Sequence, residues 1–223
     1  STRHPIYFWI KRLGYRIALW VAANRASLIT VPTQVVARDV HHFYHPSASV
    51  DVTGEGMTEL PSPGDRPMKE PYILYVGSAY PHKRVDLLMD AWEVLSKKYP
   101  THQLVVTGEA DPFLQRLKDR VLKESLPRMH FPGRLSDQSL ATYYHHAELF
   151  VFPSSHEGFG LPPLEAISQG CPAVISDIPC HLEVAAVPGV LFFRNGDRDD
   201  MIEKIESALG SRTALVQATM AGA

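Results

Sequence analysis

From Tyr72 onward, short apolar runs alternate with amphipathic segments of helical length, and this alternation constrains the fold more than any other feature. Six runs of strand length begin at residues 72, 103, 129, 149, 172 and 190, and a helical pattern separates most of them. Strands joined by helices are parallel, because the helix returns the chain to the same end of the sheet. We therefore predict an α/β fold with a doubly wound, parallel, six-stranded sheet.

The first 70 residues lack this alternation. A basic amphipathic helix is predicted near the N-terminus, where Ile10, Leu13 and Ile17 recur at helical spacing beside Lys11 and Arg12. A short strand and a second helix follow, and a stretch rich in Pro and Gly then indicates a linker. The predicted organisation is a small partial N-terminal segment (helix, strand, helix) at residues 1–52, a linker at 53–70, a main domain at 71–210 and a tail at 211–223.

Composition and charge narrow the classes of function. A formal net charge of -2 gives no reason to expect a nucleic-acid partner. The charges within the N-terminal helix argue against a signal peptide or a membrane span. Its basic face leaves two alternatives, contact with an anionic membrane or packing on a neighbouring sheet, and we favour packing. Cys171 and Cys180 are predicted to be small packing residues in a reducing compartment, and His41, His42 and His45 lack the partners that a metal site needs.

Candidate binding residues follow the predicted strands, because doubly wound sheets bind ligands at the carboxyl ends of their strands. Gly77 and Ser78 follow the first strand, and Lys83 lies a few residues further on as a cation for an anionic ligand. Arg134 and Leu135 follow the third strand. We predict that these two residues form the rim of a pocket for a planar base.

The fourth strand leads into the stretch EGFGLPPLE, residues 157–165. Pro162 and Pro163 suit the first turn of a helix, where a missing N–H removes no hydrogen bond. Gly158 and Gly160 allow a ligand to approach the backbone just before that helix. Free amides and the positive end of a helix dipole favour an anion, so we predict a diphosphate site here.

Two glutamates flank this predicted diphosphate site. Glu165 is expected in the first turn of the helix, where the dipole keeps it ionised and able to accept hydrogen bonds from a pair of hydroxyls. Glu157 lies on the preceding loop. A diphosphate between two acceptors predicts a nucleotide sugar, with the ribose at one carboxylate and the transferred sugar at the other. Glycoside hydrolysis is disfavoured, because it needs an acid of raised pKa and the helix start is expected to lower that of Glu165.

Residues 71 to about 209 resemble the C-terminal, donor-binding domain of GT-B retaining glycosyltransferases of glycosyltransferase family 4. EGFGLPPLE resembles the E-x7-E signature of that family, and YVGSAYPHKRVDLLMDAW and GCPAVISDIP resemble two of its other blocks. The resemblance implies a Rossmann-like sheet. It also implies that residues 1–52 are the end of an N-terminal acceptor domain, so that the sequence, which does not begin with Met, is expected to be a fragment.

The resemblance implies roles for individual residues. Lys83 and Glu157 would be catalytic, with Lys83 at the donor phosphates and Glu157 at the transferred sugar, while Glu165 would bind the ribose. The other implied donor-binding residues are Gly77, Ser78, Arg134, Leu135, Gly158, Phe159, Gly160 and Leu161. Ser78 departs from the family pattern, because many members have Arg at this position.

The activity implied by the resemblance is retaining transfer of a hexose from a GDP- or UDP-linked sugar to a glycan or lipid-linked acceptor, in polysaccharide biosynthesis of the cell envelope. The form YVGSAYPHK favours mannose, and neither a metal nor another cofactor is expected. We expect a cytoplasmic protein with peripheral contact at the inner face of the membrane, inactive without its acceptor domain. A non-catalytic nucleotide-sugar-binding module and a nucleotide-sugar epimerase remain alternatives, whereas the missing G-x-G-x-x-G disfavours a dinucleotide oxidoreductase.

Overall fold

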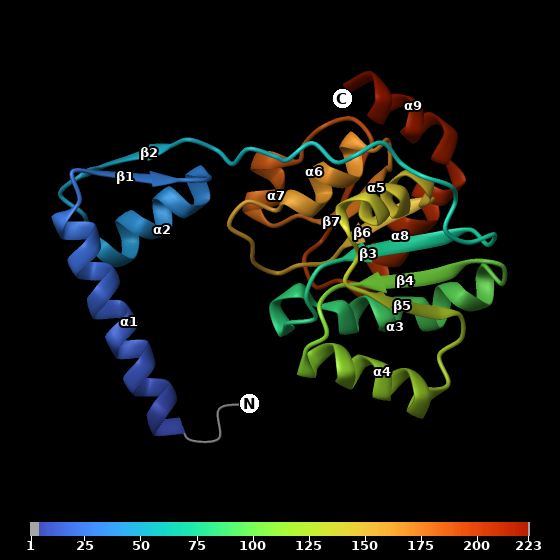
Figure 1. Ribbon diagram of the computed structural model, residues 1–223, viewed down its shortest axis with the longest axis horizontal. Coiled ribbons are helices and arrows are strands. Elements are labelled where there is room, and N and C mark those ends of the chain that lie inside the picture. The colour runs from blue at the N-terminus through green and yellow to red at the C-terminus, as the bar shows by residue number, and fades with distance from the viewer. Residues whose placement is uncertain (1–4, 223) are drawn as a thin grey trace. The chain divides into compact units, whose positions relative to one another are not determined.

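The computed structural model describes residues 5–222. Residues 1–4 and 223, which belong to the predicted N-terminal segment and tail, lie outside the described residues. The chain divides into two compact units, one that ends at Gly56 and one that begins at Met57. Each unit is described by itself, and Figure 1 labels their elements.

The first unit contains two helices and two short parallel strands. The side chain of Thr33 accepts a hydrogen bond from the amide of Val36 and so caps the second helix. The helix, strand and helix that the sequence predicts are present, and a second strand, whose sequence SVDV is not an apolar run, follows them. The elements are α1 (Pro5–Arg25), β1 (Leu28–Val31), α2 (Gln34–Tyr44) and β2 (Ser49–Val52), with β1 paired to β2.

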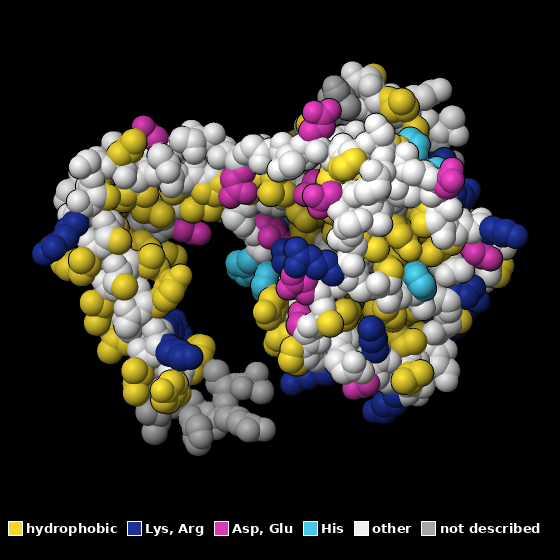
Figure 2. All heavy atoms as spheres, viewed as in Figure 1, with side chains coloured by type: hydrophobic (Ala, Val, Ile, Leu, Met, Phe, Trp, Pro, Cys, Tyr) yellow, Lys and Arg dark blue, Asp and Glu magenta, His cyan; other side chains and the backbone are white. Residues whose placement is uncertain are grey.

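Helix α1 exposes most of its large apolar side chains, including Trp9, Tyr15 and Trp20. Figure 2 shows apolar side chains gathered over this helix. Within the described residues α1 contacts α2, and the packing on a sheet that we favoured stays a prediction. None of the helices within residues 5–222 is long and apolar enough to cross a membrane.

The second unit is the predicted α/β domain. Its six strands form one parallel sheet in the order β5-β4-β3-β6-β7-β8, which confirms the predicted fold class. The strands are β3 (Tyr72–Val76), β4 (Gln103–Thr107), β5 (Met129–Gly133), β6 (Leu149–Phe152), β7 (Ala173–Ser176) and β8 (Val190–Phe193). The helices are η1 (Pro81–Lys83), α3 (Val85–Lys98), α4 (Pro112–Glu124), α5 (Asp137–His146), α6 (Leu161–Ser168), α7 (Pro179–Val184), α8 (Arg198–Gly210) and α9 (Arg212–Gly222).

Helices cover both faces of this sheet. Figure 1 shows α5 and α6 on one face and α3 and α4 on the other, and α8 packs against α3. Every residue of β6 and β7 is buried, which explains why β6 is a continuous apolar run and why β7 is apolar up to Ser176. Three of these helices were not predicted, the short η1, α7 and α9, and α9 occupies the segment that we expected to be a tail.

The strand order fixes the place of the functional site. From β3 the chain winds outward through β4 to β5, then returns to β6 on the other side of β3 and continues to β8. The order therefore reverses between β3 and β6. Ligands of doubly wound sheets bind in the crevice at this switch point, beyond the carboxyl ends of the strands.

Candidate functional site

The loops after β3 and β6 meet at the switch point and are hydrogen-bonded to each other. The carbonyl of His82 accepts a hydrogen bond from the amide of Ser155 at 2.7 Å and another from the Ser155 hydroxyl at 3.1 Å. His82 lies in η1 beside Lys83, and Ser155 lies two residues before Glu157. The two hydrogen bonds therefore place the predicted catalytic residues next to each other.

Lys83 and Glu157 form an ion pair at this junction. Lys83 Nζ lies 2.6 Å from Glu157 Oε1, and the side chains are only 16% and 12% exposed. The Lys83 ammonium also lies 5.1 Å from the ring centroid of Phe152, within range of a cation–π interaction. A cation and a carboxylate are thus held together at the junction of the two loops.

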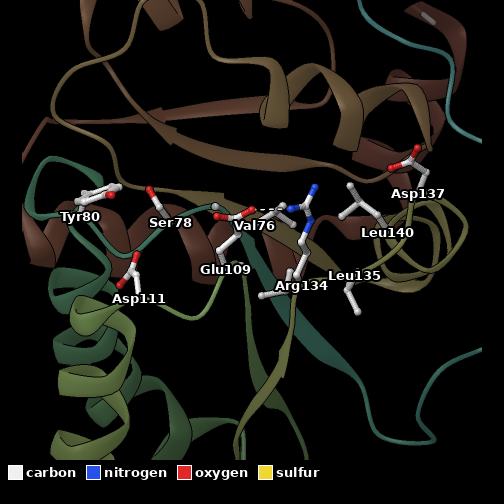
Figure 3. A pocket seen from close by; sticks show the side chains of 12 residues that line it. Val76, Ser78, Tyr80, Glu109, Asp111, Arg134, Leu135, Asp137 and Leu140 are labelled. Carbon is white, nitrogen blue, oxygen red and sulfur yellow. Dashed lines mark hydrogen bonds and ion pairs between the residues drawn. The ribbon is translucent and has the colours of Figure 1, made fainter.

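A cavity of about 400 Å³ lies at the carboxyl ends of β3, β4 and β5 (Figure 3). Arg134 and Glu109 point toward one another at its mouth and form an ion pair of 2.6 Å between Nη1 and Oε1. Both side chains are largely exposed, so a ligand can reach them. The residues that line the cavity are Val76, Gly77, Ser78, Tyr80, Thr107, Gly108, Glu109, Asp111, Arg134, Leu135, Asp137 and Leu140.

Tyr75 connects the cavity to the ion pair. Its hydroxyl donates to the carbonyl of Ser78 at 2.7 Å, and its ring stacks on Phe152 with centroids 6.0 Å apart. Burial raises the pKa of the Tyr75 phenol, and the Glu157 charge raises it further, so the hydroxyl remains a donor. Gly77 has a φ of +145°, and a Cβ on Gly108 would lie 2.1 Å from the Gly77 carbonyl oxygen, so this loop requires glycine at both positions.

The start of α6 offers fewer amides than a typical helix start. Gly160 is the N-cap with a φ of +89°, and Leu161 is the first helical residue. Pro162 and Pro163 then remove two donors. Any anion held here depends mainly on the amides of Gly160 and Leu161 and on the nearby Lys83.

Glu165 differs from the sequence prediction. It is the fifth residue of α6, beyond the first turn, so the helix start contributes little to its charge state. Burial raises the pKa of the Glu165 carboxyl, and the hydrogen bond that Tyr144 Oη donates to Oε2 at 2.9 Å lowers it by less. The prediction that Glu165 lies in the first turn, where the dipole would lower its pKa, is therefore wrong. The helix start also gives no reason to disfavour hydrolysis.

Replacing Tyr144 with Phe is expected to destabilise the domain by about 1 kcal/mol at pH 7, because the ionised Glu165 loses its donor. The pKa of Glu165 is raised on folding, so the folded state binds more protons and its stability falls as the pH rises through that pKa. Tyr144→Phe should make the loss of stability with rising pH larger. Urea unfolding at pH 4 and pH 7 gives the free energy of unfolding of the variant and of the wild type. If the two proteins differed no more at pH 7 than at pH 4, the hydrogen bond from Tyr144 would not stabilise the ionised Glu165. Tyr143→Phe is the control, because its hydroxyl makes no hydrogen bond within residues 5–222.

Gly77, Ser78, Arg134 and Leu135 line the cavity, whereas Lys83, Glu157 and Glu165 do not. Lys83 and Glu157 pair with each other, and Glu165 accepts its hydrogen bond from Tyr144. Helix α5 links the cavity to Glu165, because Leu140 lines the cavity and Tyr144 lies one turn later. In the part of the chain that the structure describes, no group of three or more His, Cys, Asp or Glu side chains is placed to hold a metal ion.

Sequence reasoning missed three residues of this site. Glu109 directly follows Gly108 after the end of β4. The strand-end rule, that ligands of doubly wound sheets bind at the carboxyl ends of the strands, selected Arg134 and therefore also selects Glu109. Tyr75 and Tyr144 gave no such signal, because each lies within an apolar pattern and resembles any other core aromatic residue.

The structure is a doubly wound α/β domain with the Lys83–Glu157 pair at the switch point of its sheet, and its sheet order is that of the C-terminal Rossmann-like domain of GT-B enzymes. Residues 57–221 match the family described as "Glycosyl transferases group 1", and the chain belongs to this family.

The relatives of this chain include mannosyltransferases. The chain is 28% identical over 187 residues to the O-antigen chain mannosyltransferase RfbU of Salmonella typhimurium strain LT2, and the alignment covers 81% of this chain and 51% of RfbU. It is 32% identical over 184 residues to the lipopolysaccharide core biosynthesis mannosyltransferase LpsB of Rhizobium meliloti, and this alignment covers 79% of this chain and 49% of LpsB. A solved sucrose-phosphate synthase from Thermosynechococcus elongatus has a TM-score of 0.80 at 22% identity, covering 92% and 55%. The chain therefore spans about half the length of these relatives.

Proposed function

We propose that this chain is the donor-binding part of a family 4 GT-B glycosyltransferase, which transfers a hexose from a nucleoside-diphosphate sugar to a glycan or lipid-linked acceptor. The observation that carries the proposal is the Lys83–Glu157 pair at the switch point of a group 1 glycosyl transferase domain. The pair supplies one group for an anion and one for hydroxyls, as a sugar diphosphate requires.

The proposed chemistry needs no metal ion. Lys83 leaves Glu157 for the diphosphate, and the amides of Gly160 and Leu161 add two donors, so the leaving group is stabilised as its charge develops. Glu157 is then free to accept hydrogen bonds from hydroxyls of the hexose, and Glu165 from those of the ribose. Stabilising the leaving group lets the anomeric carbon gain positive charge, and we propose attack from the same face with retention of configuration.

The mouth of the cavity favours guanine over uracil. Guanine presents two adjacent N–H donors and a carbonyl oxygen on one edge, which suit the carboxylate of Glu109 and the guanidinium of Arg134. Uracil presents one N–H between two carbonyl oxygens, and a carboxylate repels both. We therefore propose a GDP-linked donor. The mannosyltransferase names of the two relatives support mannose as the hexose and a cell-envelope glycan as the acceptor.

The remaining partners are also proposals. The exposed apolar surface of α1 fits contact with the rest of an N-terminal acceptor domain, for which the greater length of the relatives leaves room. A cytoplasmic location with peripheral contact at the inner face of a membrane agrees with the basic residues of the same helix.

Calorimetric titration of this chain in EDTA with GDP, UDP, GDP-mannose and UDP-glucose tests the proposal. We expect GDP to bind about tenfold more tightly than UDP, because one good two-point contact distinguishes bases by about 1–3 kcal/mol. Replacing EDTA with Mg²⁺ should leave the affinities unchanged. Absence of binding by every nucleotide would contradict the function, and equal binding of GDP and UDP would contradict only the choice of base. In the full-length enzyme, binding without transfer favours a binding module, and product without an acceptor favours an epimerase.

A further inference from the structure

Helix α7 contacts the loop that carries Glu157 through two buried side chains. The Cys180 thiol donates to the carbonyl of Phe159, with Sγ 3.1 Å from the oxygen. The His181 ring packs against Gly160, where an added Cβ would lie 3.4 Å from Cδ2 and 3.5 Å from Nε2. Cys180 and His181 are 2% and 1% exposed. Neither side chain can therefore reach a ligand directly.

The hydrogen bonds of His181 define its tautomer. Nδ1 lies 2.9 Å from the carbonyl oxygen of Ser176, which can only accept, so Nδ1 carries the hydrogen. The Ser176 hydroxyl hydrogen is used elsewhere, because it is donated to the Ser154 carbonyl. Burial lowers the pKa of His181, so the ring is neutral and Nε2 is a bare acceptor. Nε2 is buried and has no hydrogen-bond partner within residues 5–222, and it faces Gly160.

The Cys180 contact also fixes the direction of the next amide. The peptide bond between Phe159 and Gly160 is trans, as are all the peptide bonds described for this chain. In a trans peptide the C=O and N–H groups point in opposite directions. Because the Phe159 carbonyl points at Cys180, the Gly160 N–H points away from α7.

We propose that Cys180 and His181 are positioning residues that hold the Phe159–Gly160 peptide so that the Gly160 N–H donates to the diphosphate of the donor. The inference rests on the proposed function, since it requires a diphosphate at the start of α6. Cys180 orients the peptide and the His181 ring supports Gly160, whose φ of +89° other residues rarely adopt. Both side chains act through the loop and not on the ligand.

Calorimetry of this chain with GDP and with guanosine, which lacks both phosphates, tests the inference. Cys180→Ala removes the hydrogen-bond donor to the Phe159 carbonyl. We expect this variant to bind GDP about tenfold more weakly than the wild type, whereas its affinity for guanosine should stay within twofold of the wild-type value. Cys180→Ser keeps an O–H donor and should restore GDP affinity to within about threefold. His181→Ala removes the support of Gly160 and should also weaken GDP selectively.

Two outcomes overturn the inference. One is that Cys180→Ala leaves GDP binding unchanged or weakens GDP and guanosine alike. The other is that Cys180→Ser binds GDP as weakly as Cys180→Ala, because the hydrogen bond would then be irrelevant. A wild-type chain that binds neither GDP nor UDP would contradict the proposed function itself, so the two failures are distinguishable. Thermal unfolding of each variant shows whether it is folded.

Discussion

Replacing Lys83 with Ala is expected to lower the affinity of this chain for GDP about 100-fold. A hydrogen bond between charged groups contributes about 1.5–3 kcal/mol, and 100-fold corresponds to about 2.7 kcal/mol. The upper part of this range applies here, because the variant also leaves the Glu157 carboxylate, 12% exposed, without its cation and beside the diphosphate. Calorimetric titration with GDP measures the loss directly.

The control for this prediction is Lys97→Ala. Lys97 has the same charge, but its side chain is 76% exposed and pairs with Glu93 along α3. We expect its removal to change GDP affinity by less than twofold, because solvent screens an exposed pair. If Lys83→Ala and Lys97→Ala lowered the affinity for GDP equally, the effect would come from net charge. Lys83 would then not be the residue that contacts the diphosphate.

The fold could be predicted because local pattern and global topology agree in the second unit. The buried strands are mainly apolar, and a central strand such as β6 is apolar on both faces. Side-chain caps at Asp111, Ser136 and Asp197 begin three of the helices. The six-residue α7 was missed because it is too short to show a helical period, and β2 was missed because its sequence, SVDV, alternates polar and apolar residues and forms no continuous apolar run.

The site could be predicted only in part, because its pairings depend on strand order. Lys83 and Glu157 are 74 positions apart and meet only because β6 lies next to β3. The strand-end rule selects both residues but does not pair them. The pKa of Glu165 is raised by burial, and Tyr144 of α5 donates a hydrogen bond to its carboxylate. The position of Glu165 along the sequence reveals neither effect. The support of Gly160 by α7 likewise joins segments that are 21 positions apart.

The second large prediction concerns Glu157→Gln. In the wild type, a diphosphate must displace Glu157 from Lys83, at 2.6 Å, before the ammonium can bind it. Gln has the same shape but no charge, so it holds Lys83 only by a weaker hydrogen bond between an ammonium and a neutral amide oxygen. We therefore expect the affinity of this chain for GDP to rise by about threefold to tenfold, as one competing partner is weakened.

Transfer should change in the opposite direction. In the full-length glycosyltransferase that we propose, Glu157→Gln is expected to lower the transfer rate about 10²–10³-fold, because the ionised acceptor for the hexose hydroxyls is lost in the transition state. A variant with higher GDP affinity and a lower transfer rate distinguishes this explanation from damage to the fold, because a distorted site would lower both the GDP affinity and the transfer rate. Glu93→Gln is the matched control, because Glu93 pairs with the exposed Lys97 and not with a site residue. A lower GDP affinity of Glu157→Gln would mean that Glu157 does not compete with the diphosphate for Lys83. The ion pair would then be a structural contact, and other residues would form the ligand site.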